Sequence, residues 1–347
     1  MPAGMKVLMV AGGTGGHVFP ALALAEELRN REVTVVWVGR PEGIERRIAS
    51  EHGYEFEPLA AGGFFGKNIR ARAVAIWLLA RGCLRSLSML RRVAADGVVA
   101  TGGFAAVAVL SAAVLAGARF FLLEQNCVPG RATRLFSRWA EETFLAFPTA
   151  RPFTGQHRIT GNPLRDSLVR GSRCDDGRTV LVLGGSLGAR ALNLAAVDAA
   201  AALADLDFII LTGQRDHEFV RSRVRSKNCE LVEFTSSPEE LFRRATIAVS
   251  RAGGMVLSEL VAFGIPAILV PFPYATDRHQ DANARHLASV GAALVLDQNR
   301  LSGLTSLIRE LANDVERREA MAAAARRVAR PDAAAVIAKR LVECLAG

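Results

Sequence analysis

The first glycine-rich loop of the chain carries residues that could bind an anion and move a proton. Gly12–His17 reads Gly-Gly-Thr-Gly-Gly-His and follows Met5–Ala11, an apolar run typical of a buried parallel strand. Pro20 and the helix-like stretch Ala21–Arg29 come next. Strand, glycine turn and helix together direct backbone N–H groups at an anion, and His17 can exchange a proton near neutral pH. The alternative is a tight turn with a capping histidine.

A second loop repeats this design at Thr101–Phe104, which reads Thr-Gly-Gly-Phe, between the apolar strand 97–100 and an apolar helix. The next strand, 120–123, runs into Glu124-Gln125-Asn126. Polar side chains at the carboxyl end of a strand lie where open α/β sheets bind ligands. Asn126 is therefore a candidate binding residue, although it could equally be a turn residue.

The pattern restarts in the second half of the chain. Thr143–Leu145 is interpreted as the last strand of the first half, and the Pro-, Gly- and polar-rich stretch 148–160 as a linker. The apolar strand 179–183 then leads into the loop Gly184–Arg190 and a helix. The chain is therefore predicted to hold two α/β halves, each opening with a strand, a glycine loop and a helix.

Dinucleotide binding is disfavoured by the details of these loops. Neither Gly12–His17 nor Gly184–Arg190 has the GxGxxG spacing. Arg40 stands after the second strand, 33–38, where a dinucleotide-binding unit usually places an acidic residue. Arg40 leaves only NADP as a compatible dinucleotide.

Ser250–Glu259 is the most informative string of the second half. Gly253 and Gly254 open a helix whose N-terminus can hold a diphosphate. Glu259, in the early turns, could accept hydrogen bonds from both ribose hydroxyls of the same nucleotide. A capping glutamate on an exposed face is the alternative, but it explains less well the neighbouring glycines, Ser258 and Arg251. Beyond this helix we expect a strand at 267–270, a loop over 271–283, and helix over 304–345 with a break near Pro331.

Composition sets outer limits on the class of protein. The chain has 347 residues, 50% of them hydrophobic, which suits two globular domains. The formal net charge of +9 suggests an anionic partner: nucleic acid, a phosphorylated substrate or an acidic membrane. The five cysteines are scattered and favour free thiols in a reducing cytosol. No signal peptide is expected, and the apolar run 104–118 is too short to span a bilayer.

The segment 61–95 is unusually basic, with seven Lys or Arg residues and no acid. Apolar side chains, among them Phe64, Phe65 and Trp77, lie between the cations, and from Ile69 the pattern predicts an amphipathic helix. A basic face beside exposed aromatic side chains is typical of a helix that lies on an anionic membrane. The alternative is an ordinary surface helix whose apolar side packs into the core.

Seven segments together resemble the MurG family, the N-acetylglucosaminyltransferases that convert lipid I to lipid II in peptidoglycan synthesis. They occur in the family's order: Gly12–His17, Thr101–Phe104, Glu124–Asn126, Gly161–Arg165, Gly184–Arg190, Arg251–Glu259 and Asp277–Gln280. The resemblance runs from about Lys6 to the C-terminal helix. It implies a GT-B glycosyltransferase fold: α/β, with two Rossmann-like domains whose parallel sheets face each other across a cleft. The domains expected are 1–160 plus 331–347, facing acceptor and membrane, and 161–330, binding the UDP-sugar.

The resemblance also implies substrates and site residues. The donor is UDP-GlcNAc, and the acceptor is undecaprenyl-diphospho-MurNAc-pentapeptide, or lipid I, met at the cytoplasmic face of the inner membrane by a peripheral protein. Donor-binding residues are Thr14, Gly15, Gly16, Asn126, Arg165, Ser186, Thr235, Gly254, Met255, Val256, Leu257, Ser258, Glu259 and Gln280. Residues for the acceptor and an anionic membrane are Gly102, Gly103, Phe65, Trp77, Arg81 and Arg85. No metal is expected, because helix dipoles and an Arg can stabilise the departing UDP. No cofactor and no nucleic acid partner are expected either.

Transfer needs a base for the acceptor's C4 hydroxyl, and His17 is the first choice, with orientation of the acceptor diphosphate as its alternative role. Four residues depart from the family's pattern: Leu123, Leu187, Thr235 and His279. Three other functions stay open on the sequence alone: another GT-B glycolipid glycosyltransferase, a UDP-GlcNAc epimerase, and a non-catalytic nucleotide-binding protein of the membrane surface.

Overall fold

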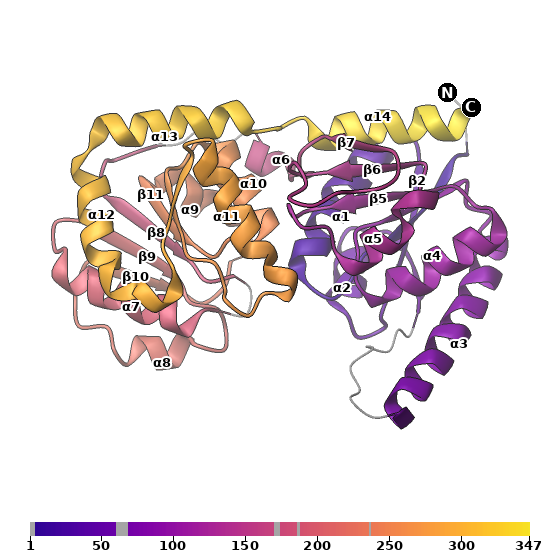
Figure 1. Cartoon of the computed structure of the whole chain (residues 1–347), viewed down its shortest axis with the longest axis horizontal. Coiled ribbons are helices and arrows are strands. Elements are labelled where there is room, and N and C mark those ends of the chain that lie inside the picture. The colour runs from indigo at the N-terminus through magenta and orange to yellow at the C-terminus, as the bar shows by residue number, and fades with distance from the viewer. Residues whose placement is uncertain (1–3, 60–68, 170–173, 186–187, 236) are drawn as a thin grey trace. The chain divides into compact units, whose positions relative to one another are not determined.

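The computed structural model describes residues 4–59, 69–169, 174–185, 188–235 and 237–347 (Figure 1). The chain divides into two compact units: unit 1 is Met1–Arg165 with Pro331–Gly347, and unit 2 is Asp166–Arg330. The predicted site residues Phe65 and Ser186 lie outside the described residues, as do Phe64 and Leu187.

Unit 1 holds a seven-stranded sheet in the order β3-β2-β1-β4-β5-β6-β7, with every described pair parallel. Its strands are β1 (Lys6–Val10), β2 (Thr34–Gly39), β3 (Glu55–Pro58), β4 (Gly97–Ala100), β5 (Phe120–Glu124), β6 (Glu142–Leu145) and β7 (His157–Ile159). Its helices are α1 (Gly15–Arg29), α2 (Ile44–Glu51), α3 (Ile69–Val93), α4 (Phe104–Ala116), α5 (Arg131–Phe136), the 3₁₀ turn η1 (Ser137–Trp139) and α14 (Ala333–Ala346).

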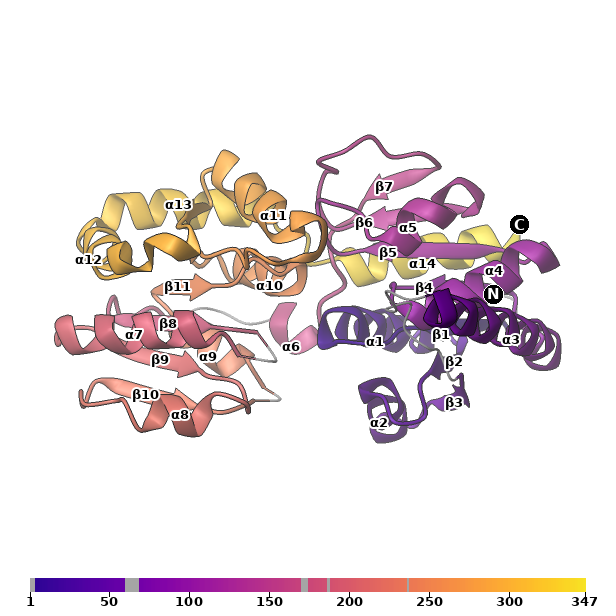
Figure 2. The same cartoon turned by 60° about the horizontal axis from the view of Figure 1, so that its bottom comes forward.

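The inner strands β1, β2, β4 and β5 of unit 1 are mostly apolar because both faces of the sheet are covered there. Along β1, Val7 and Met9 enter one buried cluster, whereas Leu8 and Val10 enter another on the opposite face. The first cluster includes side chains of α1 and α14, and the second includes those of α3 and α4. Leu341 of α14 is fully buried, so the last helix of the chain belongs to the core of unit 1. Figure 2 shows α3 beside α4 in this unit.

Unit 2 holds a six-stranded parallel sheet in the order β10-β9-β8-β11-β12-β13. Its strands are β8 (Thr179–Leu183), β9 (Asp207–Leu211), β10 (Cys229–Val232), β11 (Ile247–Ser250), β12 (Ala267–Leu269) and β13 (Ala293–Val295). Its helices are α6 (Asp166–Val169), α7 (Arg190–Ala202), α8 (His217–Arg221), α9 (Glu239–Arg244), α10 (Gly254–Phe263), α11 (His279–Ser289), α12 (Leu304–Asn313) and α13 (Val315–Val328), with 3₁₀ turns η2 (Thr276–Arg278) and η3 (Gln298–Gly303).

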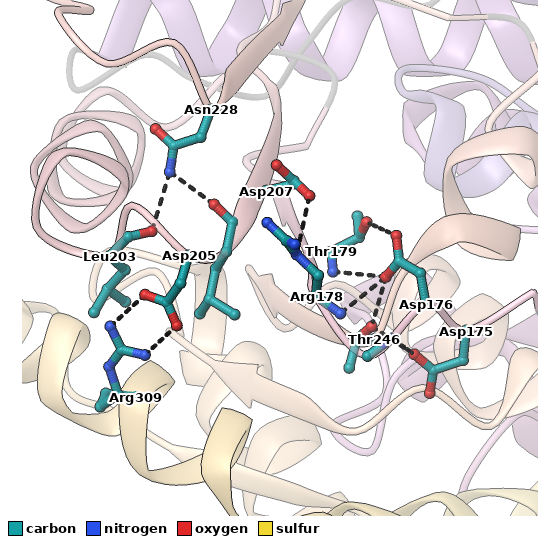
Figure 3. A network of polar contacts seen from close by, with 12 residues as sticks. Asp175, Asp176, Arg178, Thr179, Leu203, Asp205, Asp207, Asn228, Thr246 and Arg309 are labelled. Carbon is teal, nitrogen blue, oxygen red and sulfur yellow. Dashed lines mark hydrogen bonds and ion pairs between the residues drawn. The ribbon is translucent and has the colours of Figure 1, made fainter.

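A polar network ties the amino ends of the unit 2 strands together (Figure 3). Asp176 accepts hydrogen bonds from the backbone N–H groups of Arg178 and Thr179, at 2.9 and 3.0 Å. Asp205 forms two 2.6 Å contacts with the Arg309 guanidinium, which lowers the pKa of Asp205 to about 2. These acids lie at the end of the sheet opposite to the glycine loops, so they organise the fold and not the ligand site.

Four expectations about elements were wrong. The stretch 148–160 is not only a linker, because it contains the edge strand β7, whose Arg158 donates to Glu142 of β6 at 2.8 Å. The predicted strand 143–145 is therefore not the last strand of this half. The loop expected over 271–283 ends earlier, since α11 begins at His279. The C-terminal helix expected over 304–345 has a further break at Asp314, which caps α13 by accepting a 2.9 Å hydrogen bond from Arg317 N–H.

Candidate active site

Both sheets bring two glycine loops to the point where the strand order reverses. In unit 1, β1 and β4 are neighbours, yet the chain proceeds from them toward opposite edges of the sheet. In unit 2, β8 and β11 have the same relationship. Open α/β sheets bind ligands at such switch points, beyond the carboxyl ends of the strands. The glycine loops that follow these four strands therefore form one candidate site in each unit.

His17 lies in the first turn of α1, which begins at Gly15 with Thr14 as its N-cap residue. The backbone N–H of His17 donates to Thr14 O at 3.1 Å, and His17 Nδ1 lies 3.4 Å from Thr14 Oγ1. The expected turn with a histidine is thus present, and the ring stands at the helix N-terminus. Thr14 and Gly16 are exposed, so this loop can be reached by a ligand.

The loop after β4 packs directly on the loop after β1. A β-carbon added to Gly102 would lie 3.2 Å from His17 Nε2, and one added to Gly103 would lie 2.9 Å from Gly12 O. Both residues have positive φ, +109° and +86°, which glycine adopts without strain. The structure therefore places Gly102 against His17 and Gly103 against Gly12.

Asn126 is held by the acid two residues before it. The Glu124 carboxylate accepts hydrogen bonds from Asn126 N and Nδ2, at 3.1 and 3.3 Å. It also accepts from Gly130 N and Thr133 Oγ1, both at 2.8 Å. Burial raises the pKa of Glu124, and these four hydrogen bonds oppose that rise. Asn126 is thus an oriented turn residue at the end of β5, which leaves its part in ligand binding as a proposal.

Arg165 belongs to unit 1. Its guanidinium carbon lies 5.2 Å from the ring centre of Phe19 on α1, a cation–π distance. The same ring is packed against the backbone of Gly15, where a β-carbon would come within 2.9 Å of Phe19 Cε2. The structure therefore places Arg165 near the first glycine loop.

In unit 2, α10 begins at Gly254, with Gly253 as N-cap residue. Within the expected donor run, Gly254, Leu257 and Ser258 are buried, whereas Met255, Val256 and Glu259 are partly exposed. Ser258 Oγ donates to Gly254 O at 3.0 Å, so this hydroxyl is used inside the helix. Glu259 stands in the second turn, partly open to solvent, as a ribose contact requires.

Gln280 joins two loops of the unit 2 site. Its Oε1 accepts hydrogen bonds from Phe272 N at 2.9 Å and Ala252 N at 3.3 Å. It thereby links the loop after β12 to the loop after β11. Asn283 adds a second link, because its Nδ2 donates to Ala252 O at 2.9 Å.

Arg251 is turned into the protein. Its guanidinium is buried and donates to Val270 O at 3.1 Å and to Gln298 Oε1 at 2.6 Å. Burial lowers the pKa of Arg251 from its usual value. Arg251 therefore fixes the ends of β11 and β12 through backbone and amide contacts.

The loop after β8 is anchored by an acid that sequence reasoning missed. Arg190 Nε donates to Asp216 Oδ1 at 2.9 Å, and a β-carbon added to Gly188 would lie 3.1 Å from Asp216 Oδ2. Gly188 has φ +78°. A lone Asp shortly after a strand was the only signal for this residue.

Thr235, an expected donor-binding residue, lies after β10. Its Oγ1 accepts a hydrogen bond from Ser237 N at 3.0 Å.

α3 has a buried side and an exposed side. Ser86, Met89 and Leu90 are buried on its inner side, whereas Trp77 is 58% exposed and Leu84 is 68% exposed. Arg81 and Arg85 are exposed, and the Arg81 guanidinium carbon lies 5.3 Å from the Trp77 ring centre. The helix thus packs on unit 1 and presents an apolar and cationic outer side.

The described residues offer neither a cluster of metal ligands nor a membrane-spanning helix. Across the described ranges, no group of three or more His, Cys, Asp or Glu side chains could hold a metal ion. No helix in the same ranges has the length and apolar character needed to cross a bilayer.

Family comparisons cover both units. Residues 7–145 match the glycosyltransferase family 28 N-terminal domain, and residues 179–339 match the family's C-terminal domain. Two parallel α/β units with glycine loops at their switch points, matched in this way, define a glycosyltransferase of the GT-B fold.

Relatives narrow this class to one family. A Methylococcus capsulatus protein is 42% identical, with 97% of this chain and 98% of that protein covered. A Myxococcus xanthus protein is 38% identical, with 98% of this chain and 93% of that protein covered. Both are named UDP-N-acetylglucosamine--N-acetylmuramyl-(pentapeptide) pyrophosphoryl-undecaprenol N-acetylglucosamine transferase. The crystal structure of Acinetobacter baumannii MurG superposes with a TM-score of 0.81 at 28% identity, covering 98% of this chain and 99% of that one. The chain belongs to the MurG family.

Proposed function

We propose that this enzyme transfers GlcNAc from UDP-GlcNAc to the C4 hydroxyl of MurNAc in lipid I, giving lipid II. The hydroxyl oxygen bonds to C1 of GlcNAc from the face opposite UDP. The bond from C1 to the UDP oxygen breaks with its electron pair, and the configuration at C1 inverts. The observation that carries this proposal is the 42% identity to a named transferase over 97% of the chain.

His17 serves as the base that takes the hydroxyl proton. Support comes from its place at the N-terminus of α1, beside the exposed loop and against Gly102. Its alternative role is to orient the acceptor diphosphate, since a helix N-terminus also favours an anion. In His17→Ala, a loss of turnover with intact affinity for the acceptor would support the role as base. A loss of acceptor affinity would support the contact with the diphosphate.

The donor nucleotide is held by unit 2. The N-terminus of α10 at Gly254 offers backbone N–H groups to a diphosphate, and Glu259, one turn further on, accepts hydrogen bonds from the ribose. Gln280 keeps the adjoining loops in place through its contacts with Ala252 and Phe272. Helix dipoles stabilise the departing UDP without a metal ion.

The acceptor is met at the cytoplasmic face of the inner membrane, where α3 holds the protein peripherally. The support is the outer side of this helix, with Trp77 exposed beside the cations Arg81 and Arg85. Such a surface attracts anionic lipid headgroups and inserts aromatic side chains among them. The polyprenyl tail of the acceptor then stays in the bilayer.

Incubation with labelled UDP-GlcNAc tests the proposal, with and without a lipid I analogue. The account predicts a labelled disaccharide lipid that forms only when the acceptor is present. Consumption of UDP-GlcNAc without acceptor would instead indicate an epimerase. Transfer to other glycolipids but not to the lipid I analogue would indicate a different GT-B glycosyltransferase.

A further inference from the structure

Glu45 is a buried acid with an unusual environment. It lies in the first turn of α2 and is fully buried. Its Oε1 accepts a 2.9 Å hydrogen bond from Arg40 N, and Arg40 Nε lies 3.8 Å from the same oxygen. Its Oε2 is also buried and has no hydrogen-bond partner among the described residues. Burial of an incompletely paired carboxyl group costs free energy, so this residue is poorly explained by stability alone.

Three glycines from three separate segments make room for this carboxyl group. They are Gly12 in the first glycine loop, Gly39 at the end of β2, and Gly43 at the N-cap of α2. A β-carbon added to Gly12 would lie 2.8 Å from Glu45 Oε1, and one added to Gly39 or Gly43 would overlap the side chain. In all three cases the nearest atoms are those of Glu45. The carboxyl group is therefore packed directly against backbone on each side.

The carboxyl group is connected to His17 by a short series of backbone contacts. Gly12, which rests on Glu45, also receives Gly103, whose added β-carbon would lie 2.9 Å from Gly12 O. The preceding residue, Gly102, faces the His17 ring, since a β-carbon added to Gly102 would lie 3.2 Å from His17 Nε2. A displacement of the Glu45 carboxyl group would thus shift Gly12, Gly103 and Gly102 in turn, and so the His17 ring. None of these glycines has a side chain that could move instead.

We propose that Glu45 is a positioning residue for the transfer reaction, which fixes the backbone of Gly12 and so the placement of His17. This inference rests on the proposed function. Oε1 accepts the hydrogen bond from Arg40 N. Oε2 accepts a hydrogen bond from the glycine loop when the MurNAc sugar of lipid I is bound. The residue touches no substrate itself.

Glu45→Gln is the first test, because it keeps the volume of the side chain and an oxygen for Arg40 N but removes the second acceptor oxygen. We expect kcat with UDP-GlcNAc and a lipid I analogue to fall about tenfold, while KM for the acceptor and the affinity for UDP stay within about twofold. Glu51→Gln is the matched control, since Glu51 lies on the same helix but is exposed. Glu51→Gln should keep the parent kcat.

Gly12→Ala tests the path of the effect. In the parent, the three atoms nearest to the added methyl group all belong to Glu45, the closest at 2.8 Å, so kcat should fall about tenfold. In a Glu45→Ala background the obstacle is gone, and the same change should alter kcat less than about twofold. This coupling in kcat would not arise if Glu45 merely stabilised α2.

The outcomes separate the inference from the proposed function. If the parent is active, two results would overturn the positioning role alone. One is a parent-like kcat in Glu45→Gln. The other is an equal loss of kcat from Gly12→Ala in the parent and in the Glu45→Ala background. A parent protein that forms no disaccharide lipid would overturn both.

Discussion

The imidazole of His17 rests on the backbone of Gly102: a β-carbon at Gly102 would lie 3.2 Å from Nε2 and 3.3 Å from Cδ2 of the ring. This contact joins the loops after β1 and β4 at the point where the strand order of unit 1 reverses. It places the only titratable side chain of the first glycine loop against a residue that must be small. The orientation of His17 therefore depends on a second, distant segment of the chain.

Gly102→Ala should lower kcat by about tenfold or more, because the methyl group displaces the His17 ring. Gly53→Ala is the matched control. Gly53 also has positive φ, +70°, but an added β-carbon there would meet nothing within 4 Å. Both variants carry the backbone strain, so Tm should fall in both, whereas kcat should fall only in Gly102→Ala. Equal kcat losses in the two variants would show that strain, and not the His17 contact, is responsible.

His17→Ala should lower kcat by about 10²-fold, a usual size for the loss of a general base. The affinity for UDP, measured by calorimetry, should hardly change, because His17 lies in unit 1 and the nucleotide part of the donor is assigned to unit 2. The acidic limb of the pH–rate profile should also disappear. Near-parent turnover across the pH range would remove the base role, and loss of acceptor affinity with normal kcat would favour diphosphate orientation.

Glu259→Ala should weaken UDP binding by about tenfold or more. A hydrogen bond to a charged group contributes about 1.5–3 kcal/mol, and 1.4 kcal/mol corresponds to about a tenfold change in Kd. Glu316→Ala, on the exposed first turn of α13, is the control with the same change in charge. A folded Glu259→Ala variant that binds UDP as the parent does would exclude this residue from the donor site.

The outer side of α3 should carry the attachment to membranes. Arg81→Glu with Arg85→Glu should reduce sedimentation with phosphatidylglycerol vesicles, since each cation contributes on the order of 1 kcal/mol and salt screens it. Phe65→Ser with Trp77→Ser should do the same, because the basic segment then loses two aromatic side chains. Activity on membrane-embedded acceptor should fall, while activity on a short-chain, water-soluble acceptor should survive.

Arg221→Glu with Arg225→Glu is the control for α3, because it makes the same charge change on exposed residues of unit 2. Vesicle binding should be close to that of the parent in this variant. If the α3 variants and the parent bound equally at low and high salt, the membrane role of this helix would be wrong.

Strands with continuous apolar runs were predictable from the sequence. The predicted runs 97–100 and 179–183 coincide with β4 and β8, because a parallel strand covered on both faces needs apolar residues at nearly every position. β7 was not predictable, since its three exposed residues are ordered by pairing with β6 and by the contact between Arg158 and Glu142. Such an edge strand has no local signature.

The glycine loops of the site were predictable from the sequence, whereas the acids that pack against them, Glu45 and Asp216, were not. Glycines in runs mark a turn with positive φ, as at Gly102 and Gly188. Glu45 and Asp216 could not be found in this way, because each acts on a glycine distant in sequence, Gly12 and Gly188 respectively. Only the fold brings an isolated acid against a distant glycine.

The linkage in the product tests the central claim most directly. The enzyme should be incubated with UDP-GlcNAc and a lipid I analogue, and the purified disaccharide lipid examined by NMR for its anomeric configuration and point of attachment. Inverting transfer predicts a single β-linked GlcNAc on C4 of MurNAc, formed with one UDP released for each disaccharide. An α-linked product, attachment at another hydroxyl, or UDP release without a lipid-linked disaccharide would contradict the account.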